Sequence, residues 1–227
     1  VVIFFLLLTS YFYLRWSQDK SGLKHWGVSL GLLWLTKFTG FILIPIIVGH
    51  RLVTRQFRSR WSRLVKAGLI AMAIFSPVII YNLALLFRYG HLDFQFSYLL
   101  GLQPDVWPTH KGKDLGTVVD KLQLLGHNLF TGENTILAIV LVASGLLLTM
   151  MICRQLIERK KVENLEAFVV TTLIFQLILL TIIGGTERFT AMLIPWLILT
   201  LTLVIDKIQQ GKIVLPIVVI IAMITLF

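Results

Sequence analysis

The sequence has few charged residues and almost no cysteine. Only 14% of its residues are charged and 57% are hydrophobic, whereas soluble domains carry about 25% charged residues. This composition excludes an ordinary soluble domain. The single cysteine, Cys153, excludes a disulfide within the chain and argues against a thiolate metal site.

Patterns that bind metal ions are also missing. The five histidines are scattered without ligand spacing such as H-x3-H. No carboxylate cluster such as D-x-D lies on a segment that we expect to face outward, so we expect no metal and no cofactor. The chain begins without methionine, inside an apolar run, and no signal-peptide pattern precedes that run. We therefore expect an internal piece of a longer protein.

What the sequence has in abundance is long apolar runs. Runs of this length suit helices that cross a bilayer core of about 30 Å. They predict an all-α, polytopic transmembrane bundle of about seven spans, forming one membrane-embedded domain over 1–227, with the first and last spans truncated. The predicted spans are 1–14, 25–49, 67–87, 134–153, 166–183, 189–205 and 213–227.

The basic residues indicate how this bundle is oriented. Alternating sides places the loops 50–66, 154–165 and 206–212 on one face, with twelve Lys and Arg, while the opposite face has eight. By the positive-inside rule the first face is cytoplasmic, which predicts a multi-pass protein of the cytoplasmic membrane. The basic, aromatic stretch from Arg55 to Arg63 favours a short helix at the lipid interface over a nucleic-acid site. We expect membrane lipid, and no nucleic acid, as a partner.

The long loop 88–133 is then external. Leu115, Val118, Val119, Leu122, Leu125 and Leu129 follow a helical period. They predict an amphipathic helix with Asp114 as a cap. This helix is too short and polar to cross the membrane, so we expect it to lie along the outer surface or to dock on the protein's own external layer.

Two basic residues are candidates for anion binding. Lys37 lies near the centre of the run 25–49, where a lysine costs roughly 2.5–3.5 kcal/mol. We therefore expect it to face a polar cavity, a paired anion or water, with an anionic ligand as the functional interpretation, unless its stem carries the charge to a headgroup. Arg188 belongs to the turn Gly184–Arg188. It is either part of a solvated charge pair with Glu187 or a second cation for a phosphate.

Other residues around Lys37 point to helix packing. Gly27, Gly31 and Gly40 predict a close approach of helices. Asn82, five residues after Pro77, is either an interhelical hydrogen-bonding group or part of a cavity.

Four motifs in order resemble glycosyltransferase family 39, the group of protein O-mannosyltransferases and aminoarabinose transferases. Gly31, Leu32, Lys37 and Gly40 resemble its G-L-x-x-x-x-K-x-x-G segment. The stretch from Pro77 to Asn82 is similar to P-x-x-x-W-N, with Tyr81 in place of tryptophan. The stretch from Asp93 to Phe96 resembles F-x-F-Q, and Arg188, Phe189 and Pro195 resemble an R-Y…P segment.

The resemblance implies a membrane glycosyltransferase of the GT-C type. Such an enzyme moves a sugar from a polyprenyl-phosphate donor to an acceptor on the extracytoplasmic side. By this likeness Lys37 and Arg188 bind the donor phosphate, while Asn82, Gln95 and His91 line the cavity. The catalytic base of the family is an acidic residue on an external loop upstream of residue 1, so we expect the fragment alone to be inactive. The sugar and the acceptor stay undetermined.

Two other functions fit the same residues. A transporter would use the intramembrane Lys37 at its substrate site, although transporters are often built from internal repeats and none is found here. A structural subunit that binds lipid without catalysis is the third alternative.

Overall fold

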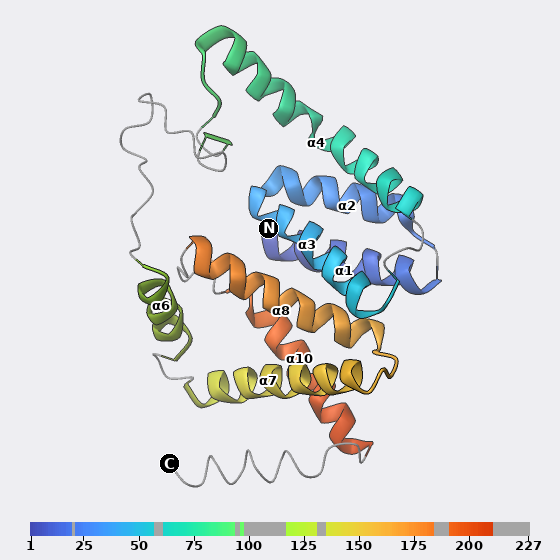
Figure 1. The fold of residues 1–227 in the computed structure, drawn as a ribbon. Coiled ribbons are helices and arrows are strands. Elements are labelled where there is room, and N and C mark those ends of the chain that lie inside the picture. The colour runs from blue at the N-terminus through green and yellow to red at the C-terminus, as the bar shows by residue number, and fades with distance from the viewer. Residues whose placement is uncertain are drawn as a thin grey trace. The chain divides into compact units, whose positions relative to one another are not determined.

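The computed structural model describes residues 1–19, 21–56, 61–93, 96–97, 117–130, 135–183 and 191–210. The regular secondary structure in these ranges is helical throughout (Figure 1). The chain divides into two compact units, one formed by Val1–Phe41 and Arg58–Leu115, and the other by Ile42–Phe57 and Gly116–Phe227. An all-helical fold was expected and is confirmed for this part of the chain.

Three helices are long and apolar enough to cross a membrane. They cover Trp61–Tyr89, Ala138–Ile157 and Asn164–Ile182, and a shorter apolar helix covers Thr39–Val53. These helices indicate a membrane-associated protein. The total of seven spans stays a prediction, and the last predicted span, 213–227, lies outside the described residues.

In the first unit, helix α2 (Leu23–Thr36) packs between α1 (Val2–Asp19) and α4 (Trp61–Tyr89). Gly27 and Gly31 of α2 lie against α4, where a Cβ atom on Gly31 would come within 2.8 Å of the carbonyl oxygen of Ala71. Glycine is needed at these two positions because the backbones approach so closely. The predicted packing role of these glycines is confirmed.

The predicted span 25–49 is not one continuous helix, and this expectation was wrong. Helix α2 ends at Thr36, the 3₁₀ helix η1 covers Phe38–Ile42, and α3 covers Leu43–Val53. Pro45 explains where α3 begins. Its ring would clash with the carbonyl group four residues earlier in an α-helix, so proline is tolerated in a first turn and excluded from an interior.

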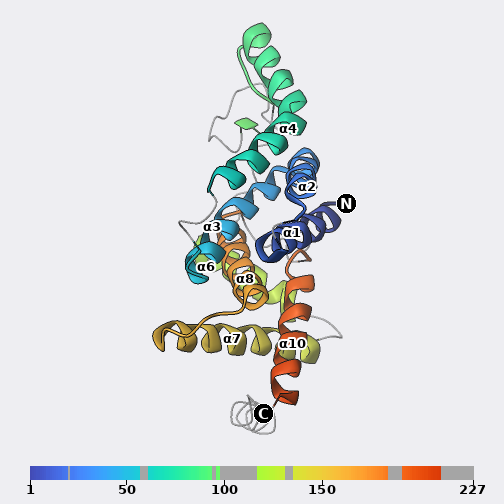
Figure 2. The ribbon, with the colours of Figure 1, turned by 90° about the vertical axis from the view of Figure 1, so that its right-hand side faces the viewer.

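In the second unit, α8 (Asn164–Ile183) contacts each of the other four helices. These are α3, α6 (Val118–Phe130), α7 (Thr135–Ile157) and α10 (Ile194–Gln209). Helices α7 and α10 cross at a steep angle (Figure 2). The central place of α8 explains why polar side chains along it are buried.

The amphipathic helix predicted in the long loop is confirmed as α6. It begins at Val118 with Thr117 as its cap. The Thr117 amide and hydroxyl both donate to the Asp120 carboxylate, at 2.6 and 2.8 Å, and these hydrogen bonds lower the pKa of that carboxyl. The predicted cap, Asp114, lies outside the described residues.

Only part of the apolar face of α6 is buried. Leu125 is buried, while Val118, Val119 and Leu122 are about half exposed. Lys121 of this helix donates to the carbonyl oxygen of Ile182 at the end of α8, at 2.8 Å. The exposed residues agree with a helix that lies along a lipid surface, and its placement on the outer side stays a prediction.

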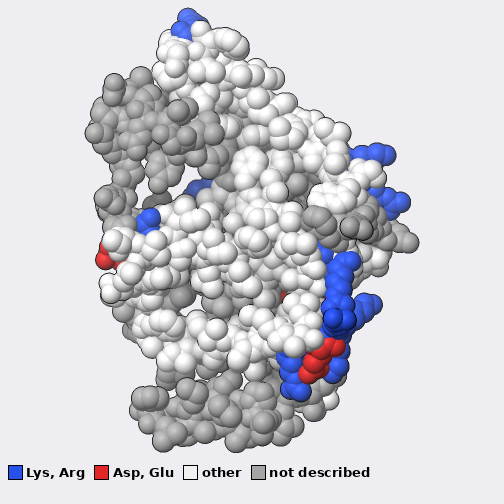
Figure 3. All heavy atoms as spheres, in the orientation of Figure 1, with Lys and Arg blue, Asp and Glu red and all other residues white. Residues whose placement is uncertain are grey.

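Polar contacts join α3, α8 and α10 at one end of the second unit. His50 near the end of α3 contacts the carbonyl oxygen of Asn164 at 3.1 Å. Lys207 in the last turn of α10 forms a buried ion pair with Glu166 in the first turn of α8. These contacts bring together the starts or ends of the loops 50–66, 154–165 and 206–212, as the alternation of spans predicts. Figure 3 shows basic side chains gathered near the α7–α8 connection.

Candidate functional site

Lys37 occupies the interruption between α2 and η1. Its backbone is extended (φ −168°, ψ 138°), and its amide donates to the carbonyl oxygen of Leu33 at 3.2 Å as the last bond of α2. The Thr36 hydroxyl also donates to Leu33 O, at 2.7 Å. The side chain of Lys37 is partly exposed. A lysine at a helix C-terminus lies beside the negative end of the helix dipole.

Aromatic side chains enclose this interruption. The rings of Trp34 and Phe41, on either side of Lys37 in sequence, stack with centroids 4.7 Å apart. The ring of Phe75 on α4 meets both edge-on, at 6.2 and 5.6 Å. Trp34 and Phe75 are buried. These contacts fix the direction in which the chain leaves α2, because three rings pack around the turn.

The aromatic cluster continues to the segment that follows α4. Phe96 lies beside Phe75, with ring centroids 6.4 Å apart. The backbone amide of Phe96 donates to the Asp93 carboxylate at 2.8 Å. The cluster therefore connects the Lys37 interruption with a group of polar residues at the end of α4, inside one compact unit.

Asn82 and Asp93 form the centre of that polar group. The Asn82 side-chain amide donates to the Asp93 carboxylate at 2.9 Å and to the carbonyl oxygen of Val78 at 3.0 Å. Its oxygen accepts from the Asp93 backbone amide at 2.9 Å. Gly90, with φ 74°, ends α4 in the left-handed conformation and allows the chain to return toward Asn82. Asn82 is thus a buried residue that holds Asp93 against its own helix.

The sequence pattern did not single out Asp93 as the partner of Asn82. In sequence, Asp93 is only the first residue of the stretch that resembles F-x-F-Q. The signal that could have found it is the glycine at position 90. A helix that ends at a left-handed glycine reverses the chain, which brings residues shortly after the turn near the last turns of the helix.

Of the three remaining predicted site residues, the structure describes His91. His91 stacks on the Tyr89 ring with centroids 6.1 Å apart, and its Nδ1 lies 3.0 Å from the carbonyl oxygen of Leu92. Gln95 and Arg188 lie outside the described residues. The structure therefore groups Lys37, Asn82 and His91 in one unit, and the joint phosphate site of Lys37 and Arg188 stays a prediction.

The second unit contains an apolar groove of about 160 Å³. For comparison, an apolar cavity of about 150 Å³ is large enough to bind benzene. Helices α7, α8 and α10 supply most of its walls, and α6 closes one side. The lining includes Phe130, Val142, Leu146, Leu173, Leu177 and Leu197. A hydrocarbon chain matches this surface, because the described residues that line the groove include no charged side chain.

Among the residues that the structure describes, no group of three or more His, Cys, Asp or Glu side chains could hold a metal ion.

Comparison with known proteins identifies no relative. No family model, curated protein or solved structure matches this chain. Its function is therefore argued from its own residues.

Proposed function

We propose that this chain is part of a membrane glycosyltransferase that takes a sugar from a polyprenyl-phosphate donor. In this proposal Lys37 binds the donor phosphate and Arg188 adds a second cation. The acceptor is reached on the extracytoplasmic side of the cytoplasmic membrane, the side of the loop 88–133. A carboxylate outside this sequence acts as the base that deprotonates the acceptor.

The interrupted helix at Lys37 is the observation that carries the proposal. Irregular backbone within a membrane is tolerated where it is buried in protein or lines a cavity. Here the irregular stretch carries a partly exposed lysine between α2 and η1. A polyprenyl phosphate holds its charge at the end of an apolar chain, so its recognition needs a cation close to hydrocarbon. As the phosphate departs from the sugar, a fixed lysine stabilises the developing negative charge.

The second unit, taken by itself, offers an apolar groove. Its volume of about 160 Å³ and its mostly aliphatic lining suit a stretch of hydrocarbon chain. The groove lies among helices of which α7 and α8 are long and apolar enough to cross a membrane.

The proposal predicts that Lys37→Ala in the complete protein lowers transfer by about 10²–10³-fold, the effect of removing one group that stabilises transition-state charge. The measurement is transfer of radiolabelled sugar from a polyprenyl-phosphate donor in proteoliposomes. Lys24→Ala is the matched control, because Lys24 is an exposed lysine at the start of the same helix. Full transfer by Lys37→Ala would refute the role of this lysine.

A transporter is the second candidate, and the same interruption favours it. Discontinuous helices form the substrate sites of many secondary transporters. In that case Lys37→Ala would reduce uptake of an anionic substrate into proteoliposomes, and no sugar would be transferred. The two assays on one preparation distinguish the candidates.

A further inference from the structure

Gln176 lies within the membrane-spanning part of α8 and has an unusual environment. Its side chain is 3% exposed, and neither its amide nitrogen nor its oxygen has a hydrogen-bond partner among the described residues. A buried amide without partners is unfavourable, and such groups in native structures call for an explanation.

Neighbouring polar side chains on α8 behave differently. The hydroxyls of Thr171 and Thr172 donate to carbonyl oxygens one turn earlier, at 2.6 and 2.7 Å. Such local bonds satisfy polar groups inside a membrane helix. Gln176 makes none of these bonds, so its amide is available to a group that does not belong to the described chain.

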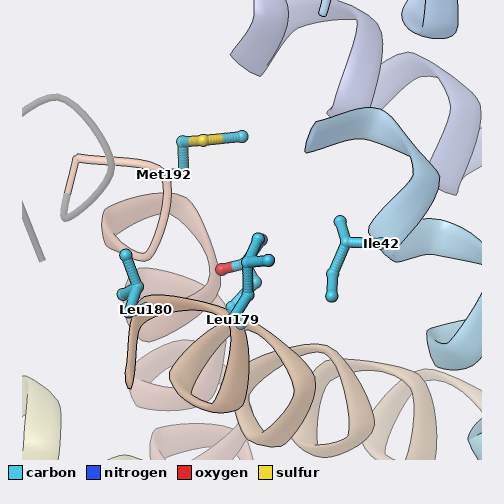
Figure 4. A pocket seen from close by; sticks show the side chains of 5 residues that line it. Ile42, Leu179, Leu180 and Met192 are labelled. Atoms are coloured by element: carbon cyan, nitrogen blue, oxygen red, sulfur yellow. The ribbon is translucent and has the colours of Figure 1, made fainter. Parts of the chain in front are cut away.

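Gln176 is one of the residues that line a small pocket in the second unit. The other walls come from Leu179 and Leu180 of α8, from Ile42 at the start of α3, and from Met192 just before α10 (Figure 4). The pocket volume is about 10 Å³, which is about the space that one water-sized group occupies. The walls other than Gln176 are apolar.

The chemistry of the pocket selects its ligand. A carboxamide both donates and accepts hydrogen bonds, and a hydroxyl group can do both in return. A phosphate or ionised carboxylate accepts only and an ammonium group donates only, so each would leave one amide atom of Gln176 unsatisfied. A buried water typically makes about three hydrogen bonds, whereas this side chain offers two polar atoms. An alcohol on an apolar chain fits best, because the chain covers the apolar walls.

We propose that the Gln176 pocket binds the hydroxyl group of a long-chain alcohol from the membrane. The nitrogen of Gln176 donates to the hydroxyl oxygen, and the oxygen of Gln176 accepts the hydroxyl hydrogen. The hydrocarbon chain of the ligand lies against Ile42, Leu179 and Met192. This site does not depend on the transferase activity, and a failure of either proposal leaves the other standing.

The test compares dodecan-1-ol with dodecane on the complete protein in lipid nanodiscs. Each is added at equal concentration in the membrane, and the shift of the thermal unfolding midpoint gives its apparent affinity. We expect dodecan-1-ol to bind at least about three- to tenfold more tightly than dodecane, since one of its two hydrogen bonds alone gives an effect in this range. Equal affinity for the two ligands in the native protein would overturn the proposal and leave a single water as the occupant.

Gln176→Met tests the residue itself. Methionine keeps the length of the side chain and removes both polar atoms, so the preference for the alcohol should disappear while dodecane affinity stays unchanged. Thr172→Val is the matched control, because Thr172 is buried on the same helix and does not line the pocket. An alcohol preference retained in Gln176→Met would overturn the assignment, and the comparison on the native protein remains decisive if that variant does not fold.

Discussion

Two buried side-chain amides, each in a helix long and apolar enough to cross a membrane, show opposite solutions to the same physical problem. Asn82 on α4 uses its nitrogen and its oxygen in hydrogen bonds to Val78 and Asp93. Gln176 on α8 has no partner for either atom in the described chain. Because the unfavourable free energy of an unsatisfied amide is similar in both places, the difference points to different roles. Asn82 stabilises a fold, and Gln176 is held ready for a ligand.

The site around Lys37 and the Gln176 pocket differ in the same way, in whether hydrogen bonds hold their residues. The residues around Lys37 in the first unit are fixed by aromatic packing and by the Asn82–Asp93 hydrogen bonds. The Gln176 pocket in the second unit is fixed by packing alone. Ile42 of this pocket follows Lys37 by five residues, and Met192 follows Arg188 by four. The three variants below test whether polar groups with partners stabilise the fold as this contrast requires.

The largest effect is expected for the buried ion pair of the second unit. Lys207→Met leaves the Glu166 carboxylate buried without its cation, and removing one partner of a buried pair costs about 3–5 kcal/mol. Both side chains are almost fully buried. The measurement is the free energy of unfolding in mixed micelles.

The double variant Lys207→Met, Glu166→Leu is the control for this prediction. Replacing both charges with apolar side chains should restore most of the lost stability, since a buried pair is often no better than a hydrophobic one. A double variant as unstable as Lys207→Met would mean that packing, and not the unpaired charge, is the cause.

Asn82→Leu is expected to have the next largest effect. It removes the hydrogen bonds that hold Asp93 against α4 and leaves the Asp93 carboxylate without the Asn82 amide, at a cost of about 2–3 kcal/mol in unfolding free energy. Ser76→Ala on the same helix is the control, because its hydroxyl bonds only to its own helix. By contrast, Gln176→Met should not destabilise the protein, since no hydrogen bond within the described chain is lost. A loss of stability in Gln176→Met as large as in Asn82→Leu would break the comparison.

Much of the fold could be predicted from the sequence, because apolar run length and helical period are strong signals in a membrane chain. The all-helical fold and the amphipathic helix are confirmed, and three of the described helices are long and apolar enough to cross a membrane. The interruption at Lys37 was missed because the run 25–49 was judged by hydrophobicity alone. Pro45 was the available signal, since a proline excludes a regular α-helix through the turn that precedes it.

The site could be predicted less well than the fold. Lys37 stands out in sequence because its charge is costly at membrane depth. Asp93 and Gln176 do not stand out in sequence. Asp93 matters because the fold brings it to Asn82, and Gln176 matters because its amide has no hydrogen-bond partner among the described residues. A lone glutamine in the apolar run 166–183 was a visible signal, but run length alone cannot distinguish a satisfied amide from an unsatisfied one.

The smallest effect is expected for the hydroxyl pair between α7 and α10. Ser144 Oγ lies 3.2 Å from Thr200 Oγ1, and both residues are buried. Each hydroxyl also lies within hydrogen-bond distance of a carbonyl oxygen of its own helix, Leu141 O at 2.7 Å and Leu197 O at 2.6 Å. A hydroxyl has one hydrogen to donate, so the interhelical bond forms only when one local bond is given up.

For this reason Ser144→Ala should lower the free energy of unfolding by about 0.6 kcal/mol, the average for interhelical hydrogen bonds in a membrane protein. Thr200→Val should have an equal effect, and the double variant should be no worse than either single one. The double-mutant cycle in mixed micelles measures this coupling. A loss near 2 kcal/mol from either variant would show that an interhelical bond made in competition with a local one can stabilise the fold as much as the hydrogen bonds of Asn82. The number of hydrogen-bond partners would then no longer explain the difference between Asn82 and Gln176.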